Sequence, residues 1–137
     1  MLYVVDSSVA LKWLLNEEDS DRAQALCESC IAGAASMVAP DILLYEVVNI
    51  LIRKRRLPIA EATAGVQIIF DSGVRLRVPD QRLMIRTAEI SDETGASAYD
   101  ASYVALAQEE NAPFITADAR LVKLCRSVAE VRLLRDI

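Results

Sequence analysis

The chain has 137 residues, a formal net charge of −5, and a composition that is 53% hydrophobic. This length is enough for one domain with a substantial core, and charges interrupt every apolar stretch well before the roughly 20 residues that cross a bilayer. The acidic balance disfavours a protein that binds nucleic acid over its whole surface, but it allows a basic patch beside an acidic pocket. We expect one domain over residues 1–137 and no association with a membrane.

The predicted elements alternate between strands and helices along the chain. Five short aliphatic runs predict strands at 2–5, 36–39, 74–78, 113–116 and 131–134. Helical spacing predicts helices at 9–15, about 20–33, 80–94, 99–110 and 118–126, with a helical hairpin within 41–71. Ser7 or Ser8 is expected to cap the first helix. The alternation predicts an α/β fold in three layers, α/β/α, with a parallel sheet covered on both faces.

The N-terminus and the cysteines both favour the cytoplasm. No basic region precedes the first apolar run, which soon meets Asp6, so a secretory signal is not expected. Cys27, Cys30 and Cys125 cannot all pair and are expected as reduced thiols. Cys27 and Cys30 form a CxxC within a helical pattern, but the chain has no histidine and no second cysteine pair. We therefore interpret them as buried thiols rather than as a zinc or redox site.

Four acidic residues stand out by their positions relative to the predicted elements. Asp6 and Asp118 come at the ends of the first and fourth strands, whereas Glu46 and Asp100 lie near the start of helices. Asp6 or Asp118 could instead cap a helix, an alternative that does not exist for Glu46 in the middle of an apolar one. If the first and fourth strands are neighbours, their carboxyl ends bring the acids to one pocket, where repulsion favours a divalent cation such as Mg²⁺ or Mn²⁺. Neutral polar groups accompany them at Ser8, Asn49 and Thr116.

Four motifs in this order, VVDSSVALKWL, PDILLYEVVNIL, AYDASYVALA and FITADARL, resemble the PIN-domain family and within it most of all the VapC-type toxins of bacterial toxin–antitoxin pairs. The resemblance implies a five-stranded parallel sheet of order 3-2-1-4-5. It also implies a ribonuclease pocket in which Asp6, Asp100 and Asp118 bind Mg²⁺ or Mn²⁺ with Glu46 beside them, and in which a water molecule hydrolyses RNA phosphodiester bonds. The implied partners are RNA, a second copy of the chain and a cognate VapB-type antitoxin.

Contacts with the RNA backbone require cations, and these concentrate in one segment. Arg53, Lys54, Arg55 and Arg56 follow the helix that carries Glu46, and we call them the basic segment 53–56. They either guide phosphates, together with Lys12 on the first helix, or only stabilise the end of a helix. Two aromatic residues are candidates for stacking on bases, with the core as their alternative position: Trp13 and Tyr45.

Three other functions remain open from the sequence. A magnesium-binding signalling domain of receiver or phosphatase type would need paired acids or a DxD after the first strand, where this chain has DSS, and a lysine late in the sheet. A non-catalytic PIN-like interaction module would be expected to have lost its acids. A PIN nuclease that processes RNA, rather than acting as a toxin, would share the chemistry and differ in its substrate.

Overall fold

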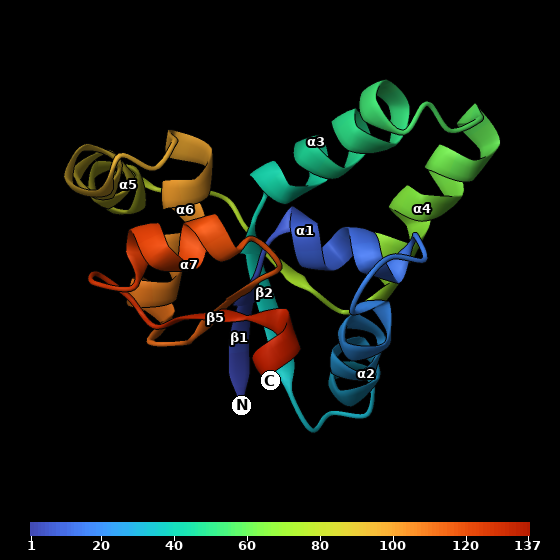
Figure 1. Ribbon diagram of the computed structural model, residues 1–137, viewed down its shortest axis with the longest axis horizontal. Coiled ribbons are helices and arrows are strands. Elements are labelled where there is room, and N and C mark those ends of the chain that lie inside the picture. The colour runs from blue at the N-terminus through green and yellow to red at the C-terminus, as the bar shows by residue number, and fades with distance from the viewer.

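The computed structural model describes all residues 1–137 and contains one parallel sheet of five strands (Figure 1). The strands are β1 (Leu2–Val5), β2 (Ser36–Pro40), β3 (Arg75–Arg77), β4 (Phe114–Thr116) and β5 (Val131–Leu133). Their order is β3-β2-β1-β4-β5, and every pairing is parallel. The expected order 3-2-1-4-5 is confirmed, and β1 and β4 are neighbours at the centre of the sheet.

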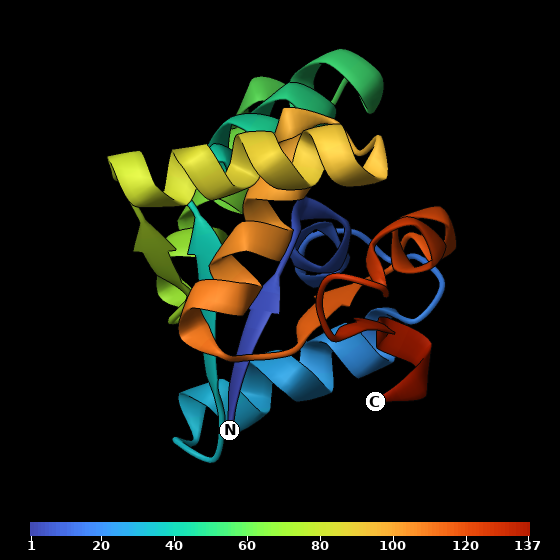
Figure 2. The same cartoon turned by 90° about the vertical axis from the view of Figure 1, so that its left-hand side faces the viewer.

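Helices cover both faces of this sheet. The first group, between β1 and β3, comprises α1 (Ser7–Ala10), α2 (Ser20–Ile31), α3 (Ile42–Asn49) and α4 (Ile59–Asp71). The second group, after β3, comprises α5 (Gln81–Thr94), α6 (Ala98–Glu110) and α7 (Ala119–Cys125). Crossovers between parallel strands are right-handed, and the direction of strand addition reverses after β3. The two groups therefore lie on opposite faces, as Figures 1 and 2 show, and the three-layer α/β/α prediction is confirmed.

The central strands and α6 form the middle of the core. Val4, Val5, Phe114 and Ile115 in β1 and β4 are fully buried, as expected for strands covered on both faces. Helix α6 packs across β1, β2 and β4 (Figure 2), and the ring of Tyr103 stacks on Phe114 with 5.6 Å between the ring centroids. This packing holds the first turn of α6, where Asp100 lies, in a fixed position relative to the sheet. No helix has the length and apolar character that a bilayer-crossing segment requires.

The helix after β1 starts earlier than expected. It begins at Ser7, continues as a 3₁₀ turn, η1 (Leu11–Trp13), and its cap is Asp6 rather than Ser7 or Ser8. A carboxylate oxygen of Asp6 accepts a hydrogen bond from the Val9 N–H at 3.2 Å, which satisfies one of the free donors of the first turn. Trp13 at the end of this segment is buried, and its indole N–H donates to the Ala23 carbonyl. Trp13 thus belongs to the core and is not a stacking platform.

The expected hairpin within 41–71 is present as an arm made by α3 and α4. The end of α3 continues as a π-helical turn, η2 (Ile50–Lys54), before the chain enters α4. The spacing of the apolar residues did not predict this turn. The Arg55 N–H donates to the Ile50 carbonyl, five residues back. Arg56 then adopts a left-handed backbone with φ of 51°, uncommon for a residue other than glycine. Such π-turns are frequent at functional sites, and this one carries half of the basic segment 53–56.

Candidate active site

Asp6 is the one charged residue buried in the structure, at 6% exposure. Its Oδ1 accepts hydrogen bonds from the Ser8 hydroxyl at 2.5 Å and the Val9 N–H, and its Oδ2 accepts from the Thr116 hydroxyl at 2.6 Å. Burial raises the pKa of Asp6 to about 6, the negative charge of Glu46 adds to this, and the three hydrogen bonds oppose it. The carboxylate is thus held in a defined orientation without a positive charge to compensate it.

The same hydroxyls connect the ends of β1 and β4. Because the two strands are paired, Thr116 at the end of β4 lies beside Asp6 at the end of β1. The Ser8 hydroxyl oxygen accepts from the Ala117 N–H at 2.9 Å, and that of Thr116 accepts from the Asp118 N–H at 3.1 Å. These bonds fix the backbone of Asp118 relative to Asp6. Ser8 and Thr116 therefore lie where the sequence predicted polar support for the acids.

Glu46 enters the site from α3 and is held by Tyr103 of α6, which was not among the predicted site residues. It is half-buried, and its Oε1 accepts a hydrogen bond from the Tyr103 hydroxyl at 2.5 Å. Burial raises the pKa of Glu46, the hydrogen bond from Tyr103 lowers it, and the charge of Asp100 raises it. The signal available for Tyr103 was its position three residues after Asp100, which puts both on one face of α6.

Asp100 and Asp118 share a cation from within the chain. Asp118 caps α7, because its Oδ1 accepts hydrogen bonds from the N–H groups of Arg120 and Leu121. It therefore has the capping role that the sequence also allowed. The guanidinium Nη2 of Arg120 lies 3.4 Å from Asp100 Oδ2 and 3.6 Å from Asp118 Oδ2. Arg120 was not among the predicted residues, although it follows Asp118 by two positions.

The four acids meet at one edge of the sheet without forming a closed set of ligands. No three acidic side chains lie close enough together, as they stand, to hold an ion. The donors are nonetheless of the kind that Mg²⁺ and Mn²⁺ prefer, carboxylate and hydroxyl oxygens. Burial and a neighbouring negative charge raise the pKa of both Asp6 and Glu46, the neighbour being Glu46 for Asp6 and Asp100 for Glu46, and a cation would relieve both effects. The residues fit a hard divalent cation by their chemistry.

The remaining predicted residues lie further out. Asn49, one turn after Glu46, is exposed and lines the groove between α3 and α4 instead of contacting the acids. The basic segment 53–56 is exposed throughout, but Arg55 is paired with Glu17 at 2.6 Å. Lys12 is half-buried in η1.

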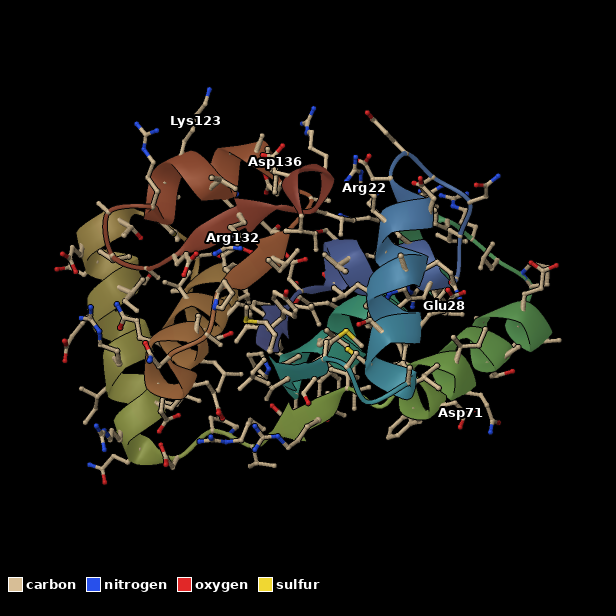
Figure 3. The ribbon with its side chains drawn as sticks, turned by 90° about the horizontal axis from the view of Figure 1, so that it is seen from below. Arg22, Glu28, Asp71, Lys123, Arg132 and Asp136 are labelled. Carbon is tan, nitrogen blue, oxygen red and sulfur yellow. The ribbon has the colours of Figure 1, made fainter.

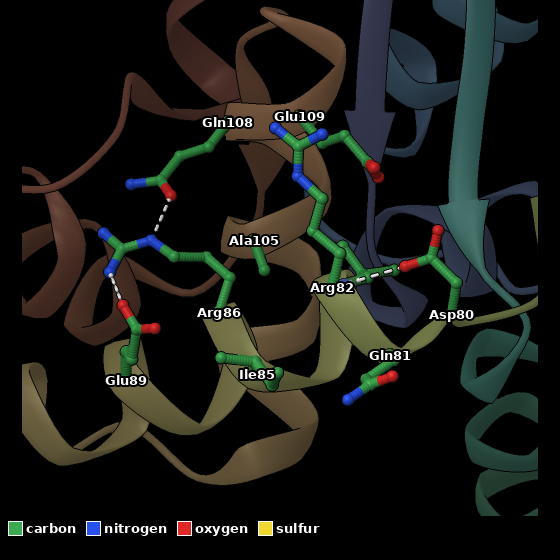
Figure 4. Close-up of a pocket in the computed structure, with 10 residues that line it drawn as sticks. Asp80, Gln81, Arg82, Ile85, Arg86, Glu89, Ala105, Gln108 and Glu109 are labelled. Atoms are coloured by element: carbon green, nitrogen blue, oxygen red, sulfur yellow. Dashed lines mark hydrogen bonds and ion pairs between the residues drawn. The ribbon is translucent and has the colours of Figure 1, made fainter.

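Two sizeable hollows lie away from the acids. One, of about 880 Å³, lies between α5 and α6 and is lined by charged and amide side chains, among which Arg86 already bonds to Gln108 and Glu89 (Figure 4). The other, of about 790 Å³, is the groove between α3 and α4, where eight of the ten lining residues are hydrophobic. The first offers no unusual chemistry, whereas the second is an apolar surface on the arm.

Comparison with known proteins places this geometry in a family. The family model described as PIN domain matches residues 3–127. Ribonuclease VapC9 of Mycobacterium tuberculosis is 34% identical over 123 residues, covering 88% of each chain, and ribonuclease VapC3 of Pyrobaculum aerophilum is 28% identical over 127 residues, covering 90% of this chain and 94% of that protein. The crystal structure of VapBC2 from Rickettsia felis, bound to a DNA fragment from its promoter, superposes with a TM-score of 0.71 at 14% identity over 97% of this chain and 98% of that one.

These matches define the class. The chain belongs to the PIN-domain family. Its fold and the resemblance carried by its four motifs are both confirmed, and a receiver- or phosphatase-like domain is not favoured.

Proposed function

We propose that the chain is a metal-dependent endoribonuclease toxin, neutralised by a cognate VapB-type antitoxin. One observation carries the proposal: Asp6 is buried and oriented at the edge of the sheet where Glu46 approaches, and no positive charge compensates it. Relatives of the chain are named VapC ribonucleases. Burying a carboxylate in this way is unfavourable for folding. A role in binding a cation explains why the chain has a carboxylate at this position. An RNA-processing role for the same chemistry has no separate observation in its favour.

Asp6, Asp100 and Asp118 are the residues that would hold Mg²⁺ or Mn²⁺, and a bound ion would supply Lewis-acid activation of water at the phosphodiester. Ser8 and Thr116 keep the Asp6 carboxylate aimed by their hydrogen bonds. Their contribution is to restrict its rotation before any ligand arrives.

Two of the acids, Glu46 and Asp118, could accept a proton from water, and Glu46 is the better acceptor. One oxygen of Asp118 is occupied as the cap of α7 and the other faces Arg120, whereas only one oxygen of Glu46 is engaged, by Tyr103. The raised pKa of Glu46 also brings it nearer to the working pH of a general base.

RNA would reach the acids past the basic segment 53–56, with Lys12 as a further cation. Arg53, Lys54 and Arg56 are exposed and form no ion pair within the chain, so their charges are available to phosphates. Tyr45 on α3, 73% exposed, remains available to stack on a base.

Two protein partners complete the proposal. The apolar groove between α3 and α4, with Tyr45, Val48 and Phe70 exposed along it, is suited to an apolar helix of the antitoxin. Two exposed apolar side chains of α5, Met84 and Ile85, support a homodimer. We also propose that residues 1–137 act as a single nuclease domain in the cytoplasm. Light scattering behind size-exclusion chromatography tests the dimer, and a monomer at micromolar concentration would exclude it.

Replacing the acids tests the nuclease assignment. Asp6→Asn and Asp100→Asn should each abolish cleavage of a mixed RNA substrate with Mg²⁺ present. The matched control is Asp71→Asn, the same chemical change at an exposed position at the end of α4 (Figure 3), and it should cleave as the native chain does. Undiminished cleavage by the purified Asp6→Asn and Asp100→Asn variants would remove both residues from the site.

A further inference from the structure

Arg120 is the side chain that faces two of the four acids from within the chain. A single nitrogen, Nη2, lies 3.4 Å from Asp100 and 3.6 Å from Asp118, and the side chain remains 65% exposed. Asp100 lies in α6 and Asp118 caps α7, so the contact joins elements that the sheet holds side by side. Sharing one nitrogen between two carboxylates at these distances is looser than the bidentate pairing of which arginine is capable.

The position of Arg120 is not explained by helix formation. It lies in the first turn of α7, where the helix dipole favours acids and disfavours cations. Two of the free N–H groups of that turn, those of Arg120 and Leu121, are already satisfied by Asp118. Exposed ion pairs of this kind contribute little to the stability of a fold. What the guanidinium does here is place positive charge between two carboxylates that otherwise have none nearby.

We propose that Arg120 is the exchangeable counter-cation of the active site: its guanidinium holds Asp100 and Asp118 when no divalent cation is bound, and a cation that binds these acids displaces it. The inference rests on the proposed function, in which both acids are metal ligands. Because the pairing is exposed and not bidentate, the displacement requires a rotation of one side chain and no change of the backbone. Arg120 is thus a positioning residue, and it makes metal binding a competition that lowers the affinity of the site.

The chain provides a matched control one turn further along the same helix. Lys123 carries the same charge, extends from α7 into solvent (Figure 3) and forms no ion pair. Replacing Lys123 by alanine changes the net charge of α7 as much as Arg120→Ala does, without removing a contact to the acids. Arg120→Gln preserves the length of the side chain without its charge, and Arg120→Lys preserves the charge.

Calorimetric titration of Mn²⁺ into the full chain, without RNA, tests the inference. Removal of two exposed ion pairs predicts that Arg120→Ala and Arg120→Gln bind Mn²⁺ roughly threefold to tenfold more tightly than the native chain. Lys123→Ala should stay within about twofold of native, and Arg120→Lys should return most of the affinity to the native value. The melting temperature of each variant in chelator verifies that it is folded.

The outcomes separate the inference from the function on which it rests. If the native chain binds Mn²⁺ and Arg120→Ala binds it no more tightly than Lys123→Ala does, the inference is wrong and the nuclease proposal stands. Weaker binding by Arg120→Ala would equally refute it, because the arginine would then assist the metal. If the folded native chain takes up no Mn²⁺, the metal site itself fails, and the inference fails with it.

Discussion

Replacing Asp6 by asparagine should make the metal-free protein more stable at neutral pH while it removes the nuclease activity. The carboxylate of Asp6 is buried at the end of β1, and its ionised form is opposed by burial and by the charge of Glu46. Asparagine occupies the same space, is neutral at every pH and still accepts a hydrogen bond through its Oδ1. The substitution therefore removes an unfavourable buried charge from the folded state.

The magnitude follows from the pKa of Asp6 in the two states. It is about 6 in the folded chain and 3.8 when unperturbed, and each pKa unit corresponds to about 1.36 kcal/mol. Ionised Asp6 thus destabilises the native fold by about 3 kcal/mol. Because the folded state binds this proton more tightly than the unfolded state does, the free energy of unfolding falls as pH rises from about 4 to 6 and stays low above pH 6.

The predicted quantity is the difference in the free energy of unfolding between the variant and the native chain, and how this difference changes with pH. Asp6→Asn should raise the free energy of unfolding by about 3 kcal/mol at pH 7.5 and by less than about 1 kcal/mol at pH 4. The gain in stability should therefore change by about 2 to 2.5 kcal/mol between these pH values. For 137 residues this corresponds to roughly 8 °C in melting temperature. A constant offset, from hydrogen bonds that an amide cannot replace, cancels in this comparison.

Urea unfolding at several pH values, in chelator, measures the effect. Asp71→Asn is the control, because Asp71 is exposed on α4, and its stability curve should run parallel to that of the native chain. If the curve of Asp6→Asn also runs parallel to that of the native chain between pH 4 and 7.5, Asp6 is not a strained buried carboxylate, and the argument for a cation at this position loses its basis.

Three further predictions test other parts of the molecule. Tyr103→Phe removes the hydrogen bond that lowers the pKa of Glu46, so the acidic limb of the pH–rate profile should move to higher pH, and an unmoved limb would exclude Glu46 as the base. Neutralising the three unpaired cations of the basic segment 53–56 should weaken the salt dependence of binding to single-stranded RNA. The slope of log binding constant against log salt should fall in magnitude by about 0.7 for each phosphate that no longer pairs with a cation. An unchanged slope in filter binding would leave this segment without a role in binding RNA. Trp13→Phe should lower the free energy of unfolding by about 1 to 3 kcal/mol without affecting RNA binding, because it removes the hydrogen bond to the Ala23 carbonyl and leaves a void beside the smaller ring in the core; stability equal to native in urea would contradict this.

Local pattern was sufficient for much of the fold. The aliphatic run before Asp6 predicts a strand wherever it lies in the sheet, because alternation and side-chain type act over a few residues. The four motifs could be placed on strand ends and helix starts for the same reason, and with the family resemblance they led to the sheet order and to Asp6, Glu46, Asp100 and Asp118 as candidates. The errors were also local: the Asp6 carboxylate displaced Ser7 and Ser8 as the cap of the first helix.

Only the tertiary structure decided which groups face these acids. Thr116 donates to Asp6 across 110 positions of sequence, and Tyr103 donates to Glu46 across 57. Such contacts depend on which strands pair and on how α6 packs over them, and these are properties of the whole sheet that no short window contains. Arg120 lies close to Asp118 in sequence, but its contact with Asp100 exists because α7 and α6 cover the same face. Sequence alone thus established which residues carry charge and the approximate positions of the strands and helices. The burial and the partners that set the energy of each charge arose from long-range packing.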